Sequence, residues 1–115
     1  MLKTLLKSKI HRATVTDSDL NYEGSIGIDV ELIKKAGLQE FEKVDIYNIN
    51  NGARFSTYVI LGKEGEVSLN GAAARLVQKG DKVIIACYGQ YDENESLVHK
   101  PTILLMDDKN KVKKG

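Results

Sequence analysis

The sequence predicts a mainly β fold, a small closed β-barrel with two short helices. Short apolar stretches rich in β-branched and aromatic residues recur along the chain, and turn-forming Gly, Asn and Asp residues separate them. Segment 30–36 is the best-delimited helix, with signals for both its start and its end. At 115 residues the chain has room for one domain, residues 1–115, with a core of modest size that oligomerisation would help to stabilise.

The first expected strand, Lys7–Val15, alternates polar with apolar or small residues, so Lys9 and His11 share one face. A short helix follows over Val30–Ala36. Asp29 is a suitable N-cap for this helix, and Gly37 suits the left-handed conformation at its end.

A hairpin is expected next, with strands Val44–Ile49 and Ala53–Leu61 joined at Asn51 and Gly52. Side chains alternate along a strand, so Arg54 and Tyr58 project from one face and Thr57 from the other. A regular strand cannot bring all three to one reacting centre. A bulge or a second wall is therefore needed if they act together.

The C-terminal half continues the same pattern of short elements. We expect strands at Val67–Leu69, Lys82–Tyr88 and Pro101–Met106, a helical turn at Ala72–Leu76, a polar loop at Gln90–Ser96 and a frayed, solvated tail at Asp107–Gly115.

Composition argues against several classes of function. Seventeen basic against sixteen acidic residues leave a net charge of +1, which does not favour nucleic acid or an anionic membrane as partner. The single Cys87 lies in an apolar run, and the two histidines form no metal-ligand spacing, so we expect no metal site. Lys3 and Lys7 interrupt the apolar N-terminus, so the chain reads as cytoplasmic, without a signal peptide or spanning helix.

Gly24 and Ser25 suggest self-cleavage chemistry. Glycine leaves its carbonyl unshielded, and the hydroxyl of the following serine is close enough to attack it. The pair is common in turns, so its neighbours decide its meaning. Three segments, Tyr22–Asp29 (YEGSIGID), Asn51–Tyr58 (NGARFSTY) and Asn70–Ala74 (NGAAA), resemble the bacterial pyruvoyl-dependent aspartate 1-decarboxylase family in order and spacing, and the resemblance extends to about Tyr88.

The resemblance implies a six-stranded double-psi β-barrel and an inactive proenzyme. Serinolysis between Gly24 and Ser25 would give a β chain, residues 1–24, and an α chain, residues 25–115, whose first residue becomes a covalent pyruvoyl cofactor. That carbonyl would form a Schiff base with L-aspartate and release carbon dioxide and β-alanine for pantothenate and coenzyme A synthesis. A cytoplasmic homotetramer with active sites at subunit interfaces is implied, together with a possible maturation factor.

The resemblance also assigns roles to individual residues. Ser25 is the pyruvoyl precursor, Gly24 its cleavage partner, Thr57 the group that polarises the scissile carbonyl and contacts substrate, and Tyr58 the proton donor after decarboxylation. Arg54 and Lys9 match positions that bind substrate carboxylates, for which a guanidinium fork and a lysine are suited. Further substrate contacts are implied at Asn70, Gly71, Ala72 and Ala73, and His11, Tyr22 and Tyr47 are plausible neighbours of the site.

Two alternatives stay open on sequence alone. A noncatalytic β-barrel interaction module would use Gly24 and Ser25 only as a turn, and its chain would remain intact. A pyruvoyl-dependent decarboxylase for another amino acid would cleave at the same place but prefer a substrate without two carboxylates.

Overall fold

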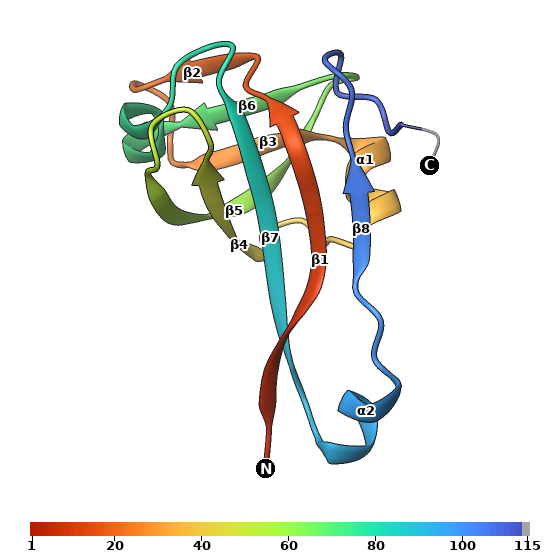
Figure 1. The fold of residues 1–115 in the computed structure, drawn as a ribbon. Coiled ribbons are helices and arrows are strands. Elements are labelled where there is room, and N and C mark those ends of the chain that lie inside the picture. The colour runs from red at the N-terminus through yellow and green to blue at the C-terminus, as the bar shows by residue number, and fades with distance from the viewer. Residues whose placement is uncertain (114–115) are drawn as a thin grey trace.

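The computed structural model describes residues 1–113, which form one hydrogen-bonded sheet with three short helices (Figure 1). The strands are β1 (Lys3–Thr14), β2 (Asp17–Asp19), β3 (Ser25–Asp29), β4 (Lys43–Asn48), β5 (Arg54–Gly62), β6 (Val67–Asn70), β7 (Lys82–Tyr91) and β8 (Thr102–Leu105). The helices are α1 (Val30–Ala36), the 3-10 helix η1 (Gly71–Leu76) and α2 (Glu93–Val98). Their order across the sheet is β2-β6-β3-β5-β4-β7-β1-β8.

The mainly β class with short helices is confirmed. All six expected strands are present, as β1 and β4 to β8, while β2 and β3 were not expected. All five residues of β3 are buried, and the segment is short with a glycine at its centre, so it carries only a weak strand signal. Closure into a double-psi barrel stays a prediction.

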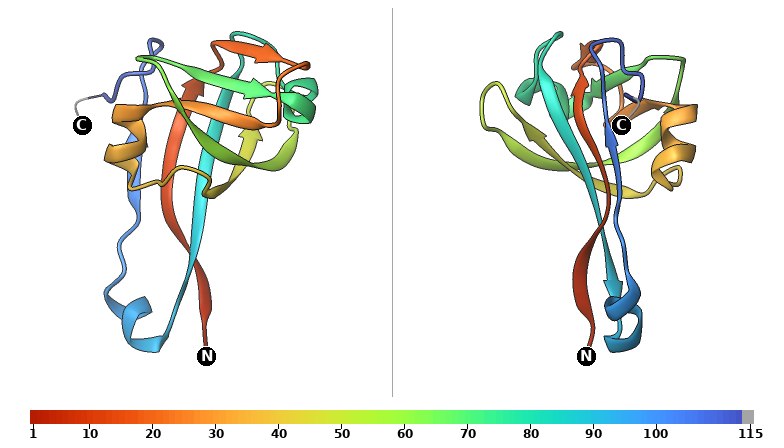
Figure 2. Two further views of the ribbon diagram at one scale, coloured as in Figure 1. Left: turned by 180° about the vertical axis from the view of Figure 1, so that it is seen from behind. Right: turned by 45° about the vertical axis from the view of Figure 1, so that its right-hand side comes forward.

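The strands differ greatly in length, and this shapes the molecule. β1 and β7 form a long antiparallel ribbon that extends away from the other strands, with α2 at its far end (Figures 1 and 2). At the opposite end the shorter strands curve around a core that includes Ile10, Ile26, Ile28, Ile46 and Ile85, all essentially inaccessible to solvent. This end contains the glycine-serine junction.

Helix α1 begins and ends as the sequence predicts. The Asp29 carboxylate accepts a hydrogen bond from the Glu31 amide at 2.8 Å, and Gly37 adopts a left-handed conformation with φ of 70°. The second carboxylate oxygen of Asp29 accepts from the Gly65 amide at 2.8 Å. Asp29 therefore joins the end of β3 to the turn between β5 and β6.

The expected polar loop at Gln90–Ser96 is wrong. Strand β7 continues to Tyr91, and α2 begins directly after Asp92. Asp92 and Glu95 form a reciprocal capping box, in which each side chain accepts a hydrogen bond from the backbone amide of the other. Two caps at the first turn satisfy amides that would otherwise be unpaired, which favours a helix in this polar segment.

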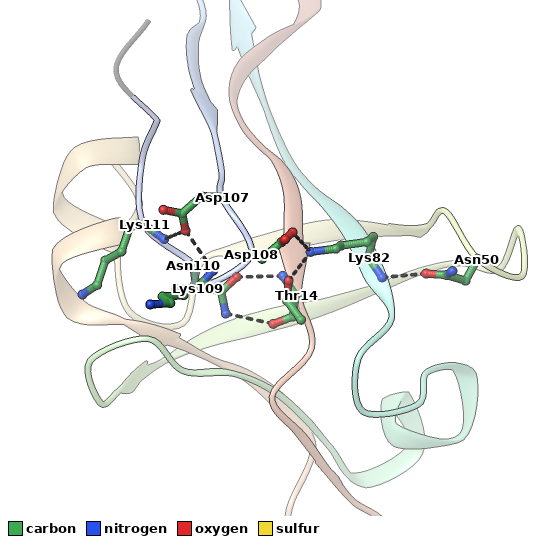
Figure 3. Close-up of polar contacts among 8 residues, drawn as sticks. All are labelled: Thr14, Asn50, Lys82, Asp107, Asp108, Lys109, Asn110 and Lys111. Carbon is green, nitrogen blue, oxygen red and sulfur yellow. Dashed lines mark hydrogen bonds and ion pairs between the residues drawn. The ribbon is translucent and has the colours of Figure 1, made fainter.

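The expected fraying of the tail is also wrong as far as residue 113. Asn110 is 1% exposed, and its side chain makes three hydrogen bonds to backbone groups, with the Thr14 amide at 2.7 Å, the Thr14 carbonyl at 2.9 Å and the Gly65 carbonyl at 2.9 Å. Asp107 accepts hydrogen bonds from the Lys109 and Lys111 amides, which turns the chain so that Asn110 points inward (Figure 3). Residues 114 and 115 of the predicted tail lie outside the described residues.

Two further features bear on expectations from composition. Cys87 is buried, and burial, aided by its hydrogen bond to Glu42, raises the pKa of the thiol to about 11. None of the helices in residues 1–113 has the length and apolar character needed to cross a membrane.

Candidate active site

Ser25 lies at the start of β3 in an unusual backbone conformation. It is 1% exposed, and its φ of 147° lies in a region that residues with side chains rarely adopt. Its antiparallel partner on β6 is Asn70, whose amide nitrogen donates a hydrogen bond to Ser25 Oγ at 3.2 Å. The serine hydroxyl is therefore buried, oriented by a neighbour and attached to a strained backbone.

Gly71 brings a second backbone segment against the junction. Its φ is 65°, and a Cβ at this position would lie 2.8 Å from Gly24 Cα and 3.1 Å from the Tyr22 carbonyl oxygen. A Cβ cannot lie 2.8 Å from a backbone carbon, so a glycine is required here by both space and conformation. Asn70 thus places its side-chain amide against Ser25, and Gly71, which has no side chain, lets its backbone lie against that of Gly24.

A cavity of about 210 Å³ opens beside the junction. Its lining residues come from the junction, β5, the end of β6 and η1, and they are Gly24, Phe55, Ser56, Thr57, Asn70, Ala72, Ala73 and Leu76. Thr57 and the small residues that the sequence assigned to the site therefore lie around one space. Phe55, Ser56 and Leu76 were not predicted, since only the course of the chain shows that they border it.

The cationic and aromatic candidates lie on a different surface. Strand β5 pairs with β4 in unbroken register, so Arg54 and Tyr58 share one face and Thr57 has the opposite one. Arg54 packs over the Tyr47 ring, 4.0 Å from its centroid, and Tyr58 is 39% exposed. No bulge brings Thr57 and Arg54 to the same face, so the second wall expected from the sequence is needed.

The Tyr47 hydroxyl is 2.9 Å from the Tyr88 hydroxyl. This hydrogen bond, together with burial, raises the pKa of Tyr47 to about 12. Tyr47 therefore keeps its proton at neutral pH and presents a neutral ring to Arg54. Tyr88 was not among the predicted site residues, and only the pairing of β4 with β7 reveals its contact with Tyr47.

Lys9 and His11 extend this surface across the sheet. Lys9 is aligned with Ala86 of β7, which is in turn aligned with Asp45 of β4, while His11 and Tyr47 both align with Ile84. Burial lowers the pKa of His11, and the nearby charges of Lys9, Arg12 and Lys113 lower it further. Its buried Nδ1 has no hydrogen-bond partner within residues 1–113.

The structure thus separates the predicted residues into two groups. The junction group lines the cavity or contacts residues that line it, and it consists of Gly24, Ser25, Thr57, Asn70, Gly71, Ala72 and Ala73. The outer-face group consists of Lys9, His11, Tyr47, Arg54 and Tyr58, none of which lines that cavity. Tyr22 belongs to neither group: it is 56% exposed and does not line that cavity, although its carbonyl oxygen lies close to Gly71.

The sequence contains no metal-ligand spacing, and the arrangement of possible ligands can be compared with that expectation. In the described part of the chain, no group of three or more His, Cys, Asp or Glu side chains is placed to hold a metal ion.

The geometry describes a small β protein in which an exposed glycine precedes a buried serine with a strained backbone, beside a cavity lined mostly by small residues. Comparison with known proteins identifies the family. The family model for aspartate decarboxylase matches residues 1–113, well beyond the Tyr88 limit of the motifs. This chain belongs to the aspartate decarboxylase family.

Individual relatives are similar over almost their whole length. An aspartate 1-decarboxylase of Campylobacter hominis is 63% identical over 110 residues, 96% of each chain. One of Bdellovibrio bacteriovorus is 62% identical over 95% of this chain and 88% of its own. One of Hydrogenobaculum is 57% identical over 97% of this chain and 90% of its own.

Proposed function

We propose that this protein is an aspartate 1-decarboxylase that makes its own cofactor at residue 25 and converts L-aspartate to β-alanine and carbon dioxide, for pantothenate and coenzyme A synthesis. The observation that carries the proposal is the Gly24-Ser25 junction, where a buried hydroxyl, a strained backbone and a glycine-only contact coincide. The family membership and the names of the relatives support the substrate.

Maturation begins with Ser25. Its Oγ attacks the Gly24 carbonyl carbon, the C–N bond breaks, and an ester joins the two residues while the nitrogen gains a proton. Elimination then removes the Cα proton of residue 25 and breaks its Cβ–Oγ bond, which leaves a Cα=Cβ double bond and releases Gly24 as a carboxylate. Water adds to the resulting enamine and ammonia leaves, so residue 25 ends as a keto amide. The products are fragments 1–24 and 25–115, which together form the one domain.

The local structure favours the first step. A planar peptide resists attack, and strain in the flanking backbone reduces the additional distortion that the transition state requires. Asn70 holds Ser25 Oγ through its amide nitrogen, and Thr57 lines the cavity beside Gly24. A hydroxyl at Thr57 is suited to donate a hydrogen bond to the oxyanion that forms at the Gly24 carbonyl.

The residues around the cavity suit a pyruvoyl group at position 25. Such a group, once joined to the substrate amine, withdraws the electron pair that loss of the α-carboxylate leaves behind. Ala72 and Ala73 leave room for a small substrate, and the amide of Asn70 can orient it. Arg54 and Lys9 supply the positive charge that a dicarboxylic amino acid needs, and Tyr58 supplies the proton for the former α-carbon.

Arg54 and Thr57 face opposite sides of β5, so we assign the cation and the cavity of one site to two copies of the chain. Lys9 and Arg54 of one copy would complete the cavity of another, as in the homotetramer expected from the sequence. The junction group of one copy and the outer-face group of another would then meet only when the copies assemble.

The first test is the intact mass of the purified protein under denaturing conditions. We expect a fragment of residues 1–24 and a second fragment one ammonia lighter than residues 25–115 produced by hydrolysis. Ser25→Ala should give a single uncleaved and inactive chain, whereas cleavage or activity in that variant would refute the mechanism. A full-length, inactive wild type would instead favour the interaction module, unless cell extract containing a maturation factor restored both cleavage and decarboxylation.

The shared site is tested by mixing subunits. Ser25→Ala and Arg54→Ala should each be inactive alone, while co-expression should restore part of the activity, because some sites would combine an intact Ser25 with an intact Arg54. Co-expressed Ser25→Ala and Thr57→Ala chains are the control, because both residues belong to one cavity and should not complement. Absence of activity in the first mixture would place Arg54 and Ser25 of one site in the same chain. We also propose that the protein is located in the cytoplasm. Decarboxylase activity measured in separated cytosolic and membrane fractions of cells would test this location.

A further inference from the structure

Phe41 occupies an unfavourable conformation beside the proposed proton donor. It lies in the connection between α1 and β4 with φ of 72°, and its side chain is 69% exposed. A bulky residue rarely adopts this left-handed region unless the surrounding structure holds it there. Glycine or asparagine would adopt this turn conformation at a lower energetic cost than phenylalanine, so the turn alone does not explain the aromatic ring.

Two backbone hydrogen bonds hold Phe41 against β5. The Phe41 amide donates to the Val59 carbonyl at 2.7 Å, and the Val59 amide donates to the Glu42 carbonyl at 3.0 Å. Because Val59 follows Tyr58 directly, this pairing fixes where Phe41 lies along the strand.

The next residue anchors the turn from the other side. Glu42 accepts hydrogen bonds from Lys7 Nζ at 2.7 Å and from the Gln39 amide at 3.0 Å. Burial alone would raise the pKa of Glu42, but the Lys7 and Gln39 contacts hold it below its ordinary value, so the carboxylate stays charged at neutral pH. The turn is therefore fastened to β1 as well as to β5.

The result is an aromatic pair between Phe41 and Tyr58. Their ring centroids are 6.5 Å apart with an interplanar angle of 44°, within the range of favourable tilted contacts. Tyr58 otherwise stands on the outer face of the sheet opposite Lys43, and no hydrogen bond from residues 1–113 fixes its hydroxyl. The Phe41 ring is thus the aromatic contact that restricts the orientation of Tyr58.

We propose that Phe41 is a positioning residue for decarboxylation, which holds the Tyr58 ring so that its hydroxyl is aimed at the carbon to be protonated. The inference rests on the proposed function, in which Tyr58 donates that proton. Proton transfer depends strongly on geometry, so a freely rotating donor would lower the turnover rate while leaving substrate binding intact.

The test compares Phe41→Gly with Phe41→Tyr. Glycine removes the ring and fits the left-handed conformation, whereas tyrosine keeps the ring and serves as the matched control. We expect both variants to self-cleave completely and to keep the Tm of the parent or exceed it. Phe41→Gly should lower kcat for aspartate by roughly two- to tenfold with little change in KM, as expected from losing one aromatic pair. Phe41→Tyr should retain most of the parent kcat.

A double variant separates positioning from a general structural effect. In a Tyr58→Phe background the donor hydroxyl is absent, so Phe41→Gly should cause no further loss of kcat. An equal loss in both backgrounds would overturn the inference, as would a fully active Phe41→Gly enzyme whose turnover still depends on Tyr58. Full activity of Tyr58→Phe alone would instead remove Tyr58 from the proposed function, and the role of Phe41 with it.

Discussion

Asn110→Ala should destabilise the protein strongly, although Asn110 belongs to a charged C-terminal tail. The side chain bonds both backbone groups of Thr14 at the end of β1 and the carbonyl of Gly65 between β5 and β6. Thr14 lies upstream of the proposed cleavage point and Asn110 lies downstream. In the mature enzyme these contacts would therefore join two separate fragments.

The magnitude follows from the groups that lose partners. Leaving a buried backbone amide or carbonyl unpaired costs about 1–3 kcal/mol, and the lower end of that range gives about 3 kcal/mol for the three groups. Alanine also fits poorly at the φ of 59° found here, which adds about 1 kcal/mol. The sum is about 4 kcal/mol for alanine and about 3 kcal/mol for Asn110→Gly.

Urea unfolding at fixed protein concentration measures this loss, in the uncleaved Ser25→Ala background so that one covalent chain is compared throughout. Lys109→Ala is the matched control, because only the backbone amide of Lys109 contacts Asp107, and it should change stability by less than about 0.5 kcal/mol. Equal stabilities of Asn110→Ala and Lys109→Ala would refute the reasoning. In mature enzyme, the same variant should release fragment 1–24 at a lower urea concentration than the parent does.

Three further predictions concern single residues. Gly71→Ala should block self-cleavage, because its Cβ would lie 2.8 Å from Gly24 Cα, and a cleaved variant seen by mass spectrometry would contradict this. Asp29 should contribute to acid unfolding: burial opposes ionisation, but the Gly65 and Glu31 amides hold its pKa below the ordinary 3.8. The charged Asp29 therefore stabilises the fold fully above the unfolded pKa of 3.8, and this stabilisation is lost as pH falls through the lower pKa of the folded protein. Asp29→Asn should accordingly make stability, measured by thermal unfolding, depend less on pH below pH 4. Cys87, with a thiol pKa of about 11, should resist iodoacetamide at pH 8 in native protein and react once unfolded, and rapid native alkylation would show that the thiol is accessible.

Features that depend on near neighbours could be predicted from the sequence. Helix α1 has its bounds, its Asp29 cap and its Gly37 end as expected, because capping involves residues only a few positions apart. The strand alternation that separates Arg54 from Thr57 was also predictable, since side chains alternate in any regular strand. The motifs around Gly24, Thr57 and Asn70 indicated a shared site, and the cavity brings these three residues together.

Features that depend on pairing between distant segments could not be predicted from the sequence. Asn110 meets Thr14 across 96 positions, and nothing in the local sequence distinguishes this asparagine from other polar residues of the tail. Strand β3 has only five residues, with a glycine at its centre, so its presence follows from pairing with β5 and β6. Likewise, Phe41 reaches Tyr58 only because the Val59 backbone bonds the turn before β4. Local conformation follows from local residues, whereas register and side-chain contacts between strands follow from how the whole chain closes on its core.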